Sequence, residues 1–584
     1  MINAEKLTFG FNSTLLFQNI SFTLEENCHC ALIGSNGTGK TTLTNLIREP
    51  ERFLYDGKLT RTNAGRIGYV SQFAIREGDQ SVTVYDYLCQ DFLALEQAIG
   101  DVCLQMESAE DMDDVMDRYQ QLLDESDAID ADNHEINIRR QLKLAELEDK
   151  ASLELENLSG GELKLVQVIR QMLRRPRLLI MDEPDVFLDF ENLNGLRDLI
   201  NAYKGTLLVV THSRYLLAHC FDRIWHLENG DLQEFAGSFN EYSCSRLQKK
   251  IDIKLASLAD EEEIQRISKL VDDLRELASE VSEAQHGRTL KGKVSYLNRL
   301  LSRQIKAPFV EIRQPDIHLP EVEPTEERTE LLRLSNYSLS FEETLLDQVS
   351  FSVHSGEKVA LVGANGTGKT SMLRQIWQNQ HPAIHFDETA SPAFFSQLHA
   401  ETLKEQNTIY EEFLALGFET HAQIEAYLQK YCFDPDSLGR KVGHLSGGEK
   451  NLLQLAKLAA GDANLLLLDE PSSHLDTFAQ IALEDAIAAY KGAVLMVSHD
   501  FYTIVNCADT ILLAENGTIR PMRARAFRKM IYKKHFHKDY LELELQKKDM
   551  ETRIARCLEA GDCAEAQRLC DKLADIVEQM QNTQ

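Results

Sequence analysis

Short runs of apolar residues recur along this chain and predict buried parallel β-strands. The runs form two sets of the same order, at residues 31–33, 179–181 and 207–210, and again at 359–362, 466–468 and 494–497. Apolar runs of this length, followed by glycine, by aspartate, or by a hydroxyl residue and histidine, are typical of strands that helices cover on both faces. The hydrophobic pattern therefore predicts two α/β domains.

A helical pattern separates these two domains. Leu247, Ile251, Leu255 and Leu258 repeat at three- and four-residue steps, and a similar series runs from residue 264 to residue 281. The spacing predicts one long amphipathic helix that ends near His286 and Gly287, followed by a shorter helix over about 294–305. Such a pair would form an antiparallel hairpin, which a proline-containing segment connects to the second domain.

Four regions follow from these patterns. They are a first domain (1–240), a helical linker (241–330), a second domain (331–520) and a C-terminal helical extension (521–584). The first domain holds an additional segment at about 95–135, in which Val115, Tyr119 and Leu122 recur at helical spacing. This insertion predicts a projecting helical hairpin, with a surface decoration of no special function as the alternative.

Composition limits the class of protein. With 43% hydrophobic and 27% charged residues and no run of 18 apolar residues, the 584-residue chain predicts a globular protein without a transmembrane helix. The N-terminus lacks the features of a signal peptide, and the 11 scattered cysteines favour reduced thiols in the cytoplasm over disulfides or a zinc site. The net charge of −31 argues against nucleic-acid binding unless basic residues are concentrated locally.

Both domains contain the sequence Gly-x-x-x-x-Gly-Lys-Thr, at residues 34–41 and 363–370, between an apolar run and a helix-forming stretch. In such a loop the glycines let backbone N–H groups approach phosphates, and the helix N-terminus adds partial positive charge. We expect Lys40 and Lys369 to reach the β- and γ-phosphates of ATP.

Acidic residues end the next strand of each domain. We expect Asp182 and Asp469 to hold Mg²⁺ together with the hydroxyls of Thr41 and Thr370. Glu183 and Glu470 follow directly, where a carboxylate can orient or deprotonate the attacking water. The same order of motifs in both domains predicts two ATP-hydrolysing sites.

Further candidates occupy matching positions. His212 and His499 end later strands and are expected to contact the γ-phosphate, while Gln72 and Gln397 are candidates to contact Mg²⁺ or water. Ser159 and Ser446, Asp182 and Asp469, and His212 and His499 are each 287 positions apart, which indicates a gene duplication. Phe11 and Phe341 are candidates to stack on adenine, with core packing as the alternative reading.

The sequence Leu-Ser-Gly-Gly-Glu stands at 158–162 and 445–449, ahead of Asp-Glu-Pro at 182–184 and 469–471. Together with the phosphate loops, these motifs closely resemble the ATP-binding cassette (ABC) superfamily over both domains. The resemblance implies that each ATP lies between the phosphate loop of one cassette and the Leu-Ser-Gly-Gly-Glu signature of the other. The nucleotide contacts it implies, besides the two phenylalanines, are Gly34, Asn36, Gly37, Gly39, Lys40, Thr41, Thr42, Ser446, Gly447 and Gly448, and Gly363, Asn365, Gly366, Gly368, Lys369, Thr370, Ser371, Ser159, Gly160 and Gly161.

Two fused cassettes with a helical linker resemble the ABC-F class, whose members act on ribosomes, and the Lys-Gly-Lys at 291–293 resembles the linker tip of its translational-throttle type. Residues 286–306 hold six Lys or Arg and no Asp or Glu. The candidates for RNA contact are Arg288, Lys291, Lys293, Arg299 and Arg303, with a solvated helix face as the alternative. The insertion matches the position of the class's ribosome-contacting arm, and the basic stretch 523–538 is a second possible RNA contact.

The first cassette departs from the family pattern. Where the class usually has Thr-Asn-His-Leu-Asp after Asp-Glu-Pro, the first cassette has Asp185-Val-Phe-Leu-Asp189, whereas the second has Ser472-Ser-His-Leu-Asp476. After the histidine the first has Ser213 and Arg214, whereas the second has the usual Asp500. This one-sided difference leads to the hypothesis that the two sites hydrolyse ATP at unequal rates.

These observations predict a cytoplasmic, monomeric ABC-F ATPase that uses ATP and Mg²⁺, binds rRNA and tRNA near the ribosomal tRNA exit site, and extends its linker toward the peptidyl-transferase centre. An antibiotic target-protection factor of the same class is the nearest alternative. A transporter ATPase with a separate membrane subunit, a DNA-repair ATPase and a non-catalytic scaffold are more distant ones.

Overall fold

A computed structural model describes residues 2–11, 14–61, 66–72, 81–106, 112–186, 188–280, 293–297, 314–323, 328–341, 344–535 and 538–583. The chain forms two compact units. The first holds both cassettes (residues 1–238 and 313–528), and the second combines residues 239–312 with residues 529–584.

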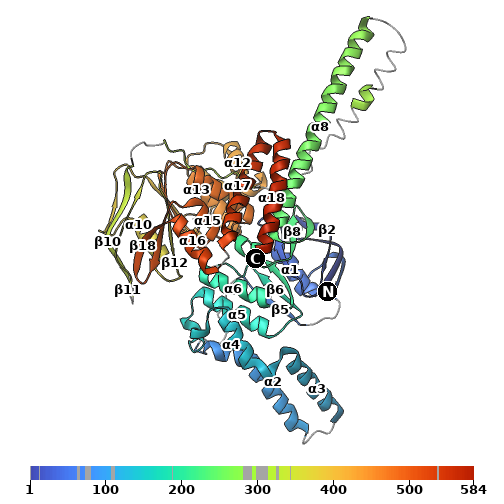
Figure 1. Ribbon diagram of the computed structural model, residues 1–584, viewed down its shortest axis with the longest axis vertical. Helices are drawn as coiled ribbons and strands as arrows, with labels where there is room; N and C mark the ends of the chain where they lie inside the picture. The colour runs from blue at the N-terminus through green and yellow to red at the C-terminus, as the bar shows by residue number, and fades with distance from the viewer. Residues whose placement is uncertain are drawn as a thin grey trace. The chain divides into compact units, whose positions relative to one another are not determined.

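The first cassette is built on a six-stranded sheet of order β5-β6-β7-β3-β8-β9, parallel except for the β8–β9 pair (Figure 1). A three-stranded antiparallel sheet of order β2-β1-β4 accompanies it. The strands are β1 (Ile2–Phe11), β2 (Thr14–Leu24), β3 (His29–Ile33), β4 (Asp56–Arg61), β5 (Ile67–Val70), β6 (Leu178–Asp182), β7 (Thr206–Val210), β8 (Arg223–Glu228) and β9 (Asp231–Ala236).

The second cassette repeats this arrangement. Its six-stranded sheet has the order β14-β15-β16-β12-β17-β18, and its smaller sheet has the order β11-β10-β13 (Figure 1). The strands are β10 (Glu330–Ser340), β11 (Thr344–His354), β12 (Lys358–Gly363), β13 (Ile384–Phe386), β14 (Pro392–Phe395), β15 (Leu465–Asp469), β16 (Ala493–Val497), β17 (Thr510–Glu515) and β18 (Thr518–Arg523). The predicted pair of α/β nucleotide-binding domains is therefore confirmed.

The predicted apolar runs form the central strands because both faces of each sheet are buried. Every residue of β6, β7, β15 and β16 is buried. Helices supply the covering layers: α1 (Lys40–Arg48), α4 (His134–Leu144), α5 (Gly160–Leu173), α6 (Phe190–Ala202) and α7 (Arg214–His219) in the first cassette, and α10 (Lys369–Gln378), α11 (Ile409–Leu414), α12 (His421–Gln429), α13 (Gly447–Ala459), α14 (Thr477–Ala489) and α15 (Phe501–Cys507) in the second.

The signature serines begin two of these helices. Ser159 caps α5 and Ser446 caps α13, each accepting a hydrogen bond from the backbone N–H of the glutamate three residues later. That glutamate in turn accepts a hydrogen bond from the serine N–H, which completes a capping box. The Ser-Gly-Gly-Glu sequence therefore fixes where each helix starts and points its first N–H groups outward.

The insertion of the first cassette consists of α2 (Val84–Met106) and α3 (Met112–Ile129), which lie side by side (Figure 1). Only Ile129 of α3 is buried. Leu104 is 67% exposed and Met116 is 51% exposed. The hairpin therefore presents apolar side chains to solvent along its length.

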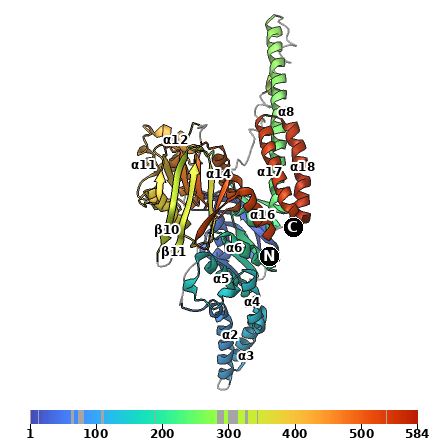
Figure 2. The same ribbon diagram turned by 60° about the vertical axis from the view of Figure 1, so that its left-hand side comes forward.

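The second unit is helical. It contains α8 (Phe239–Glu280), α17 (Lys538–Glu559) and α18 (Cys563–Thr583), and α18 packs against both of the others (Figure 2). Ile251 of α8, Ile554 of α17 and Leu573 of α18 belong to one hydrophobic core. The linker helix and the C-terminal extension, treated as separate regions in the sequence analysis, thus share a core. α16 (Ala524–His535) joins the second cassette to this unit.

Candidate active sites between the two cassettes

In each phosphate loop, a glycine has a left-handed backbone conformation and the lysine donates hydrogen bonds to carbonyl oxygens of the same loop. Gly39 and Gly368, which precede α1 and α10, have φ values of 97° and 87°, a conformation that costs little only for glycine. Lys40 Nζ donates to the carbonyl oxygens of Gly34 and Ser35, at 2.9 Å each. The ammonium group of Lys40 therefore lies within its loop, where a bound phosphate would compete with these carbonyls for its protons.

The predicted magnesium ligands lie together in each cassette. Thr370 Oγ1 donates to Asp469 Oδ1 at 2.9 Å, and the Thr41 hydroxyl is hydrogen-bonded to Asp182. The other oxygen of each aspartate (Asp182 Oδ1, Asp469 Oδ2) is buried without a partner among the described residues. Buried carboxylate oxygens without partners are costly, and a hard divalent cation would satisfy them. These residues therefore fit the magnesium ion that an ABC ATPase uses with ATP.

The candidate general bases have environments that favour proton uptake. Glu183 and Glu470 adopt left-handed backbone conformations, with φ values of 44° and 52°. Burial raises the pKa of Glu183 to about 7, and Asp185 adds to the rise. Burial also raises the pKa of Glu470 to about 8, with Asp469 the next contribution. Carboxylates poised near neutral pH are suited to accept a proton from water.

The glutamates differ in their hydrogen-bond partners. Gln72 Nε2 donates to Glu183 Oε2 at 2.6 Å, so the predicted glutamine and the base of the first cassette lie in direct contact. Glu470 Oε2 instead accepts from the backbone N–H of His499 at 3.2 Å. Gln397 lines the cavity beside Glu470 without a hydrogen bond to it.

Both predicted histidines face the sites as neutral rings. The two ring nitrogens of His212 are buried without a partner among the described residues, and burial holds its pKa well below the usual range. Burial lowers the pKa of His499 to about 4, and Lys369 adds to the effect. A neutral imidazole can donate one hydrogen bond to an anionic oxygen, which suits the predicted contact with a γ-phosphate.

Each phosphate loop contacts the opposite cassette. The Asn36 backbone N–H donates to Asp476 Oδ2 at 3.3 Å, and Asn36 Nδ2 donates to the carbonyl oxygen of His474 at 2.8 Å. In the reciprocal position, the Asn365 backbone N–H donates to Asp189 Oδ2 at 3.1 Å. Asp189 and Asp476 also cap α6 and α14 through their other oxygens. The two cassettes are therefore closed on each other.

The signature of the second cassette lies directly against the first phosphate loop. A Cβ atom on Gly448 would come within 1.8 Å of Asn36 Nδ2 and 2.6 Å of the His474 carbonyl oxygen. The other signature, Ser159 to Gly161, lines a cavity of about 620 Å³ together with Asn365, Gly366, Gly368, Lys369, Thr370 and Ser371. The structure thus brings the signature of each cassette to the phosphate loop of the other.

The remaining predicted residues have varied placements. Phe11 and Phe341 are 53% and 68% exposed, and the Phe11 ring also packs edge-to-face against the buried Phe9 at 5.0 Å, so stacking on adenine stays a prediction. Thr42 follows Thr41 in the first turn of α1. Of the RNA-contact candidates, Lys293 lies in a short described helical segment, and Arg288, Lys291, Arg299 and Arg303 lie outside the described residues.

Some residues at the sites were not predicted from the sequence. Asp189 and Asp476 each accept a hydrogen bond from the phosphate loop of the opposite cassette. The only sequence signal for them was that each follows a leucine at the matching position of its cassette. Lys164 of α5 is 2% exposed and donates to the backbone oxygens of Ser71 and Gln72, the latter at 2.9 Å. The buried ammonium group therefore anchors the segment that carries Gln72.

Lys164 belongs to a charged cluster that the second cassette lacks. Burial lowers the pKa of Lys164 to about 8, although Asp185 and other carboxylates oppose the shift. Asp185 accepts a hydrogen bond from Thr211 Oγ1 at 2.7 Å, and burial raises its pKa to about 6. The matching positions in the second cassette are Asn451 and Ser472, which are uncharged. The first cassette therefore has a carboxyl group, Asp185, near a buried ammonium group, Lys164, where the second cassette has two uncharged side chains.

Comparisons with known proteins define the class. The family model described as ABC transporter matches residues 17–186 and 346–473, just over half of the chain and both cassettes. The chain therefore belongs to the ABC transporter family, and it is an ATPase. Within the described residues, no helix is long and apolar enough to cross a membrane.

Relatives match along most of the chain. It is 28% identical over 521 residues to the energy-dependent translational throttle protein EttA of Escherichia coli (strain K12), an alignment that covers 85% of this chain and 89% of that protein. It is also 28% identical to the uncharacterized ABC transporter ATP-binding protein YfmM of Bacillus subtilis (strain 168), over 86% of this chain and 96% of that protein. A solved structure titled RNase-L Inhibitor matches with a TM-score of 0.51 and 18% identity, covering 91% of this chain and 92% of that one, and supports the fold.

Proposed function

We propose that this protein is an ABC-F ATPase that binds the ribosome near the tRNA exit site and modulates translation. The observation that carries the proposal is the closed pair of cassettes in one chain, each phosphate loop in contact with the other cassette. The similarity to a translational throttle protein over 85% of the chain supports a role in translation.

ATP binding would hold the two cassettes together. Each triphosphate would lie between one phosphate loop and the opposite signature helix, whose N–H groups face it from the capped end of α5 or α13. The aspartates Asp182 and Asp469 would hold Mg²⁺, and Glu183 and Glu470 would accept the proton of the attacking water. Hydrolysis would weaken the contact between the cassettes.

Ribosome binding then depends on the difference between closed and open cassettes. A ribosome that binds the closed form more tightly shifts the protein toward that form, and hydrolysis reverses the shift. No membrane partner is needed for this cycle, and we place the protein in the cytoplasm as a monomer.

Two helical elements are the proposed contacts. Helix α8 has 42 residues, a length of about 63 Å. We propose that the linker, of which this helix is the first part, extends toward the peptidyl-transferase centre and tRNA. The proposed basic contact residues are Arg288, Lys291, Lys293, Arg299 and Arg303. The α2–α3 hairpin, with exposed Leu104 and Met116, is the proposed arm on the exit side. Arginine and lysine would position this linker through phosphate contacts that read no sequence.

Ribosome co-sedimentation of the Glu183→Gln, Glu470→Gln double variant tests the proposal. Without its general bases the variant should remain closed on ATP and pellet with 70S particles, whereas the same variant with ADP should stay in the supernatant. Replacing Arg288, Lys291 and Lys293 with glutamate provides a linker control, which should weaken pelleting while the variant still binds ATP. Absence of pelleting with ATP would contradict the proposal and direct attention to a membrane or DNA partner.

Protection mapping would separate the two ABC-F roles. A regulator should protect tRNA and exit-site rRNA without changing the occupancy of a bound antibiotic. Displacement of the antibiotic on addition of the ATP-bound double variant would instead favour target protection.

A further inference from the structure

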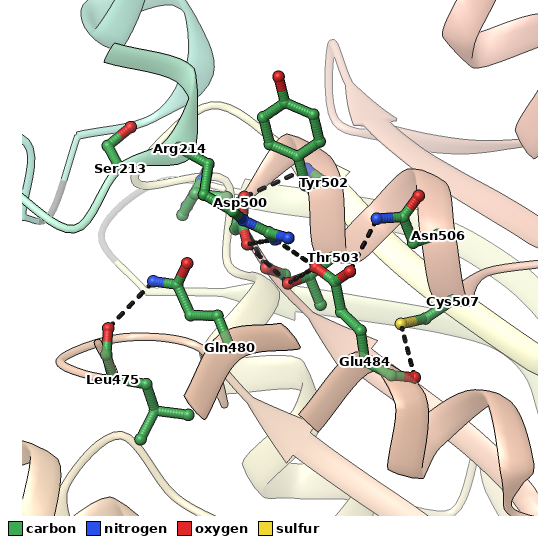
Figure 3. A network of polar contacts seen from close by, with 12 residues as sticks. Ser213, Arg214, Leu475, Gln480, Glu484, Asp500, Tyr502, Thr503, Asn506 and Cys507 are labelled. Atoms are coloured by element: carbon green, nitrogen blue, oxygen red, sulfur yellow. Dashed lines mark hydrogen bonds and ion pairs between the residues drawn. The ribbon is translucent and has the colours of Figure 1, made fainter. Parts of the chain in front are cut away.

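An ion-pair cluster crosses between the two cassettes beside the second ATP site. Arg214, the first residue of α7 in the first cassette, points into the second cassette (Figure 3). Its Nη2 pairs with Glu484 of α14 and, at 3.1 Å, with Asp500 Oδ2. We call these three residues the cross-cassette cluster.

The cross-cassette cluster is shielded from water. The side chains of Arg214, Glu484 and Asp500 are 11%, 6% and 22% exposed. Thr503 Oγ1 donates to Asp500 at 2.6 Å and to Glu484 at 3.2 Å, and Asn506 Nδ2 donates to Glu484 at 2.7 Å. Burial opposes the charge of Arg214, but the two carboxylates outweigh it and raise the pKa of the guanidinium. The guanidinium is thus the only cation that the structure shows paired with either carboxylate among the described residues.

The cluster acts on a loop that belongs to the second site. Asp500 directly follows His499, and Asp500 Oδ1 accepts from the Tyr502 backbone N–H at 3.1 Å, which caps α15. The His499 N–H in turn donates to Glu470 at 3.2 Å. Arg214 therefore holds the residue next to His499, and that backbone contacts the candidate general base.

The opposite direction has no equivalent pair. The positions related to the cluster by the 287-residue offset are Phe501, Arg197 and Ser213. The ring of Phe501 packs against that of Phe190 at 5.6 Å, and Arg197 Nη1 donates to the Tyr215 hydroxyl at 2.6 Å within its own cassette. The loop after His212 therefore receives no matching ion pair from the second cassette among the described residues.

We propose that Arg214 is a positioning residue that the first cassette supplies in trans to the second ATP site. Closure of the cassettes takes the carboxylates of Glu484 and Asp500 out of water, and the guanidinium compensates this loss while it fixes the His499 loop. A carboxylate pair left without its cation would repel and displace the loop. The proposal depends on ATP hydrolysis and not on ribosome binding, so the two can fail separately.

The test is single-turnover ATP hydrolysis by the protein alone, without ribosomes. Arg214→Met is introduced into Glu183→Gln protein, in which only the second site hydrolyses, and into Glu470→Gln protein, in which only the first does. We expect the second-site rate to fall about tenfold or more and the first-site rate to change less than about threefold, because truncating one partner of a buried charge pair is costly. Equal losses at both sites, or no loss at the second, would overturn the proposal.

Matched variants separate positioning from folding. Arg197→Met removes a cation of the same cassette that does not reach across, and should leave the second-site rate within about twofold of its parent. Arg214→Lys keeps a charge that can reach both carboxylates and should recover most of the lost rate, as should the exchanged pair Arg214→Glu with Glu484→Arg. Lysine as slow as methionine in a protein with unchanged thermal stability would overturn the proposal even if the exchanged pair did not fold.

Discussion

The two cassettes share one fold and differ where loops meet at the ATP sites. Their six-stranded sheets have the same strand order. Both cassettes also have a phosphate loop, a capping box at the signature serine and an Asp-Glu pair at the end of a strand. The first cassette, however, has the Lys164 and Asp185 charges where the second has Asn451 and Ser472. The buried central strands therefore match in the two cassettes, whereas the charges differ within α5, at Lys164, and in the loop after β6, at Asp185.

The difference has a chemical consequence for the candidate bases. Asp185 is a negative neighbour of Glu183, and Lys164 holds the Gln72 segment that contacts it. Glu470 has Asp469 and Asp500 as negative neighbours and contacts the His499 loop, which Arg214 of the other cassette supports. The first base therefore depends on its own cassette, and the second depends on both.

Blocking closure should give the largest effect and should affect both sites alike. In Gly448→Val, the side chain would meet Asn36 of the other cassette, so the cassettes cannot close as they do here, and it would also meet the His474 carbonyl of its own cassette. We expect ATP hydrolysis to fall about 100-fold or more, because small displacements of catalytic groups have effects of this size. Steady-state ATPase assays measure this, with Gly461→Ala, which meets only an ordinary contact at 3.5 Å, as the control. Normal hydrolysis by the valine variant would contradict the shared interface.

Removing the buried cation should distinguish the first cassette from the second. Lys164→Met removes the ammonium group that lies near the carboxyl groups of Asp182, Glu183 and Asp185. We expect the free energy of unfolding to fall by about 3 kcal/mol. The matching Asn451→Leu removes only uncharged hydrogen bonds and should cost about 1 kcal/mol. Denaturant unfolding measures both. Adding Asp185→Ser to Lys164→Met should restore part of the loss, and strict additivity would show that the two residues do not interact.

The exposed phenylalanines should contribute equally to the two sites. We expect Phe11→Ala and Phe341→Ala each to weaken ATP binding at one site by about 1 kcal/mol, roughly fivefold, if the rings stack on adenine. Titration with a fluorescent ATP analogue measures the affinity, and Phe→Tyr substitutions, which keep an aromatic ring, should bind normally. Unchanged affinity in both alanine variants would remove the predicted stacking.

The smallest effect concerns pH. A general base works only when ionised, so hydrolysis at each site should be lost as pH falls through the pKa of its glutamate, about 7 for Glu183 and about 8 for Glu470. Asp185→Ser removes a negative neighbour and should lower the pKa of Glu183, so that first-site hydrolysis persists to a pH lower by less than about one unit. The pH profile of the Glu470→Gln background measures this shift. The profile of the Glu183→Gln background should not move, and an equal shift in both would contradict the assignment.

The motifs alone predicted the fold class, because glycine loops, strand-ending acids and apolar runs are local patterns with a fixed spacing. The structure adds to the predicted catalytic residues their contacts, such as that of Gln72 with Glu183. The catalytic residues themselves could be predicted from the sequence because each motif corresponds to one step of binding or hydrolysis.

The contacts between cassettes were less accessible to sequence reasoning. Glu484 and Arg214 lie 270 positions apart, and neither belongs to a motif. Lys164 lies in a helix, and the sequence alone does not distinguish this buried lysine from an ordinary surface lysine. The shared core of α8 and α18 was likewise missed, because two amphipathic patterns far apart in the chain do not reveal that they pack together.

The most direct test of unequal sites compares the Glu183→Gln and Glu470→Gln variants in single-turnover hydrolysis under identical conditions. Each variant reports the one site that retains its base. The structure predicts rates that differ by at least about threefold, a difference of about 0.7 kcal/mol in activation free energy, and a second-site rate that alone depends on Arg214. Equal rates across the pH range, with equal sensitivity to Arg214→Met, would contradict the account.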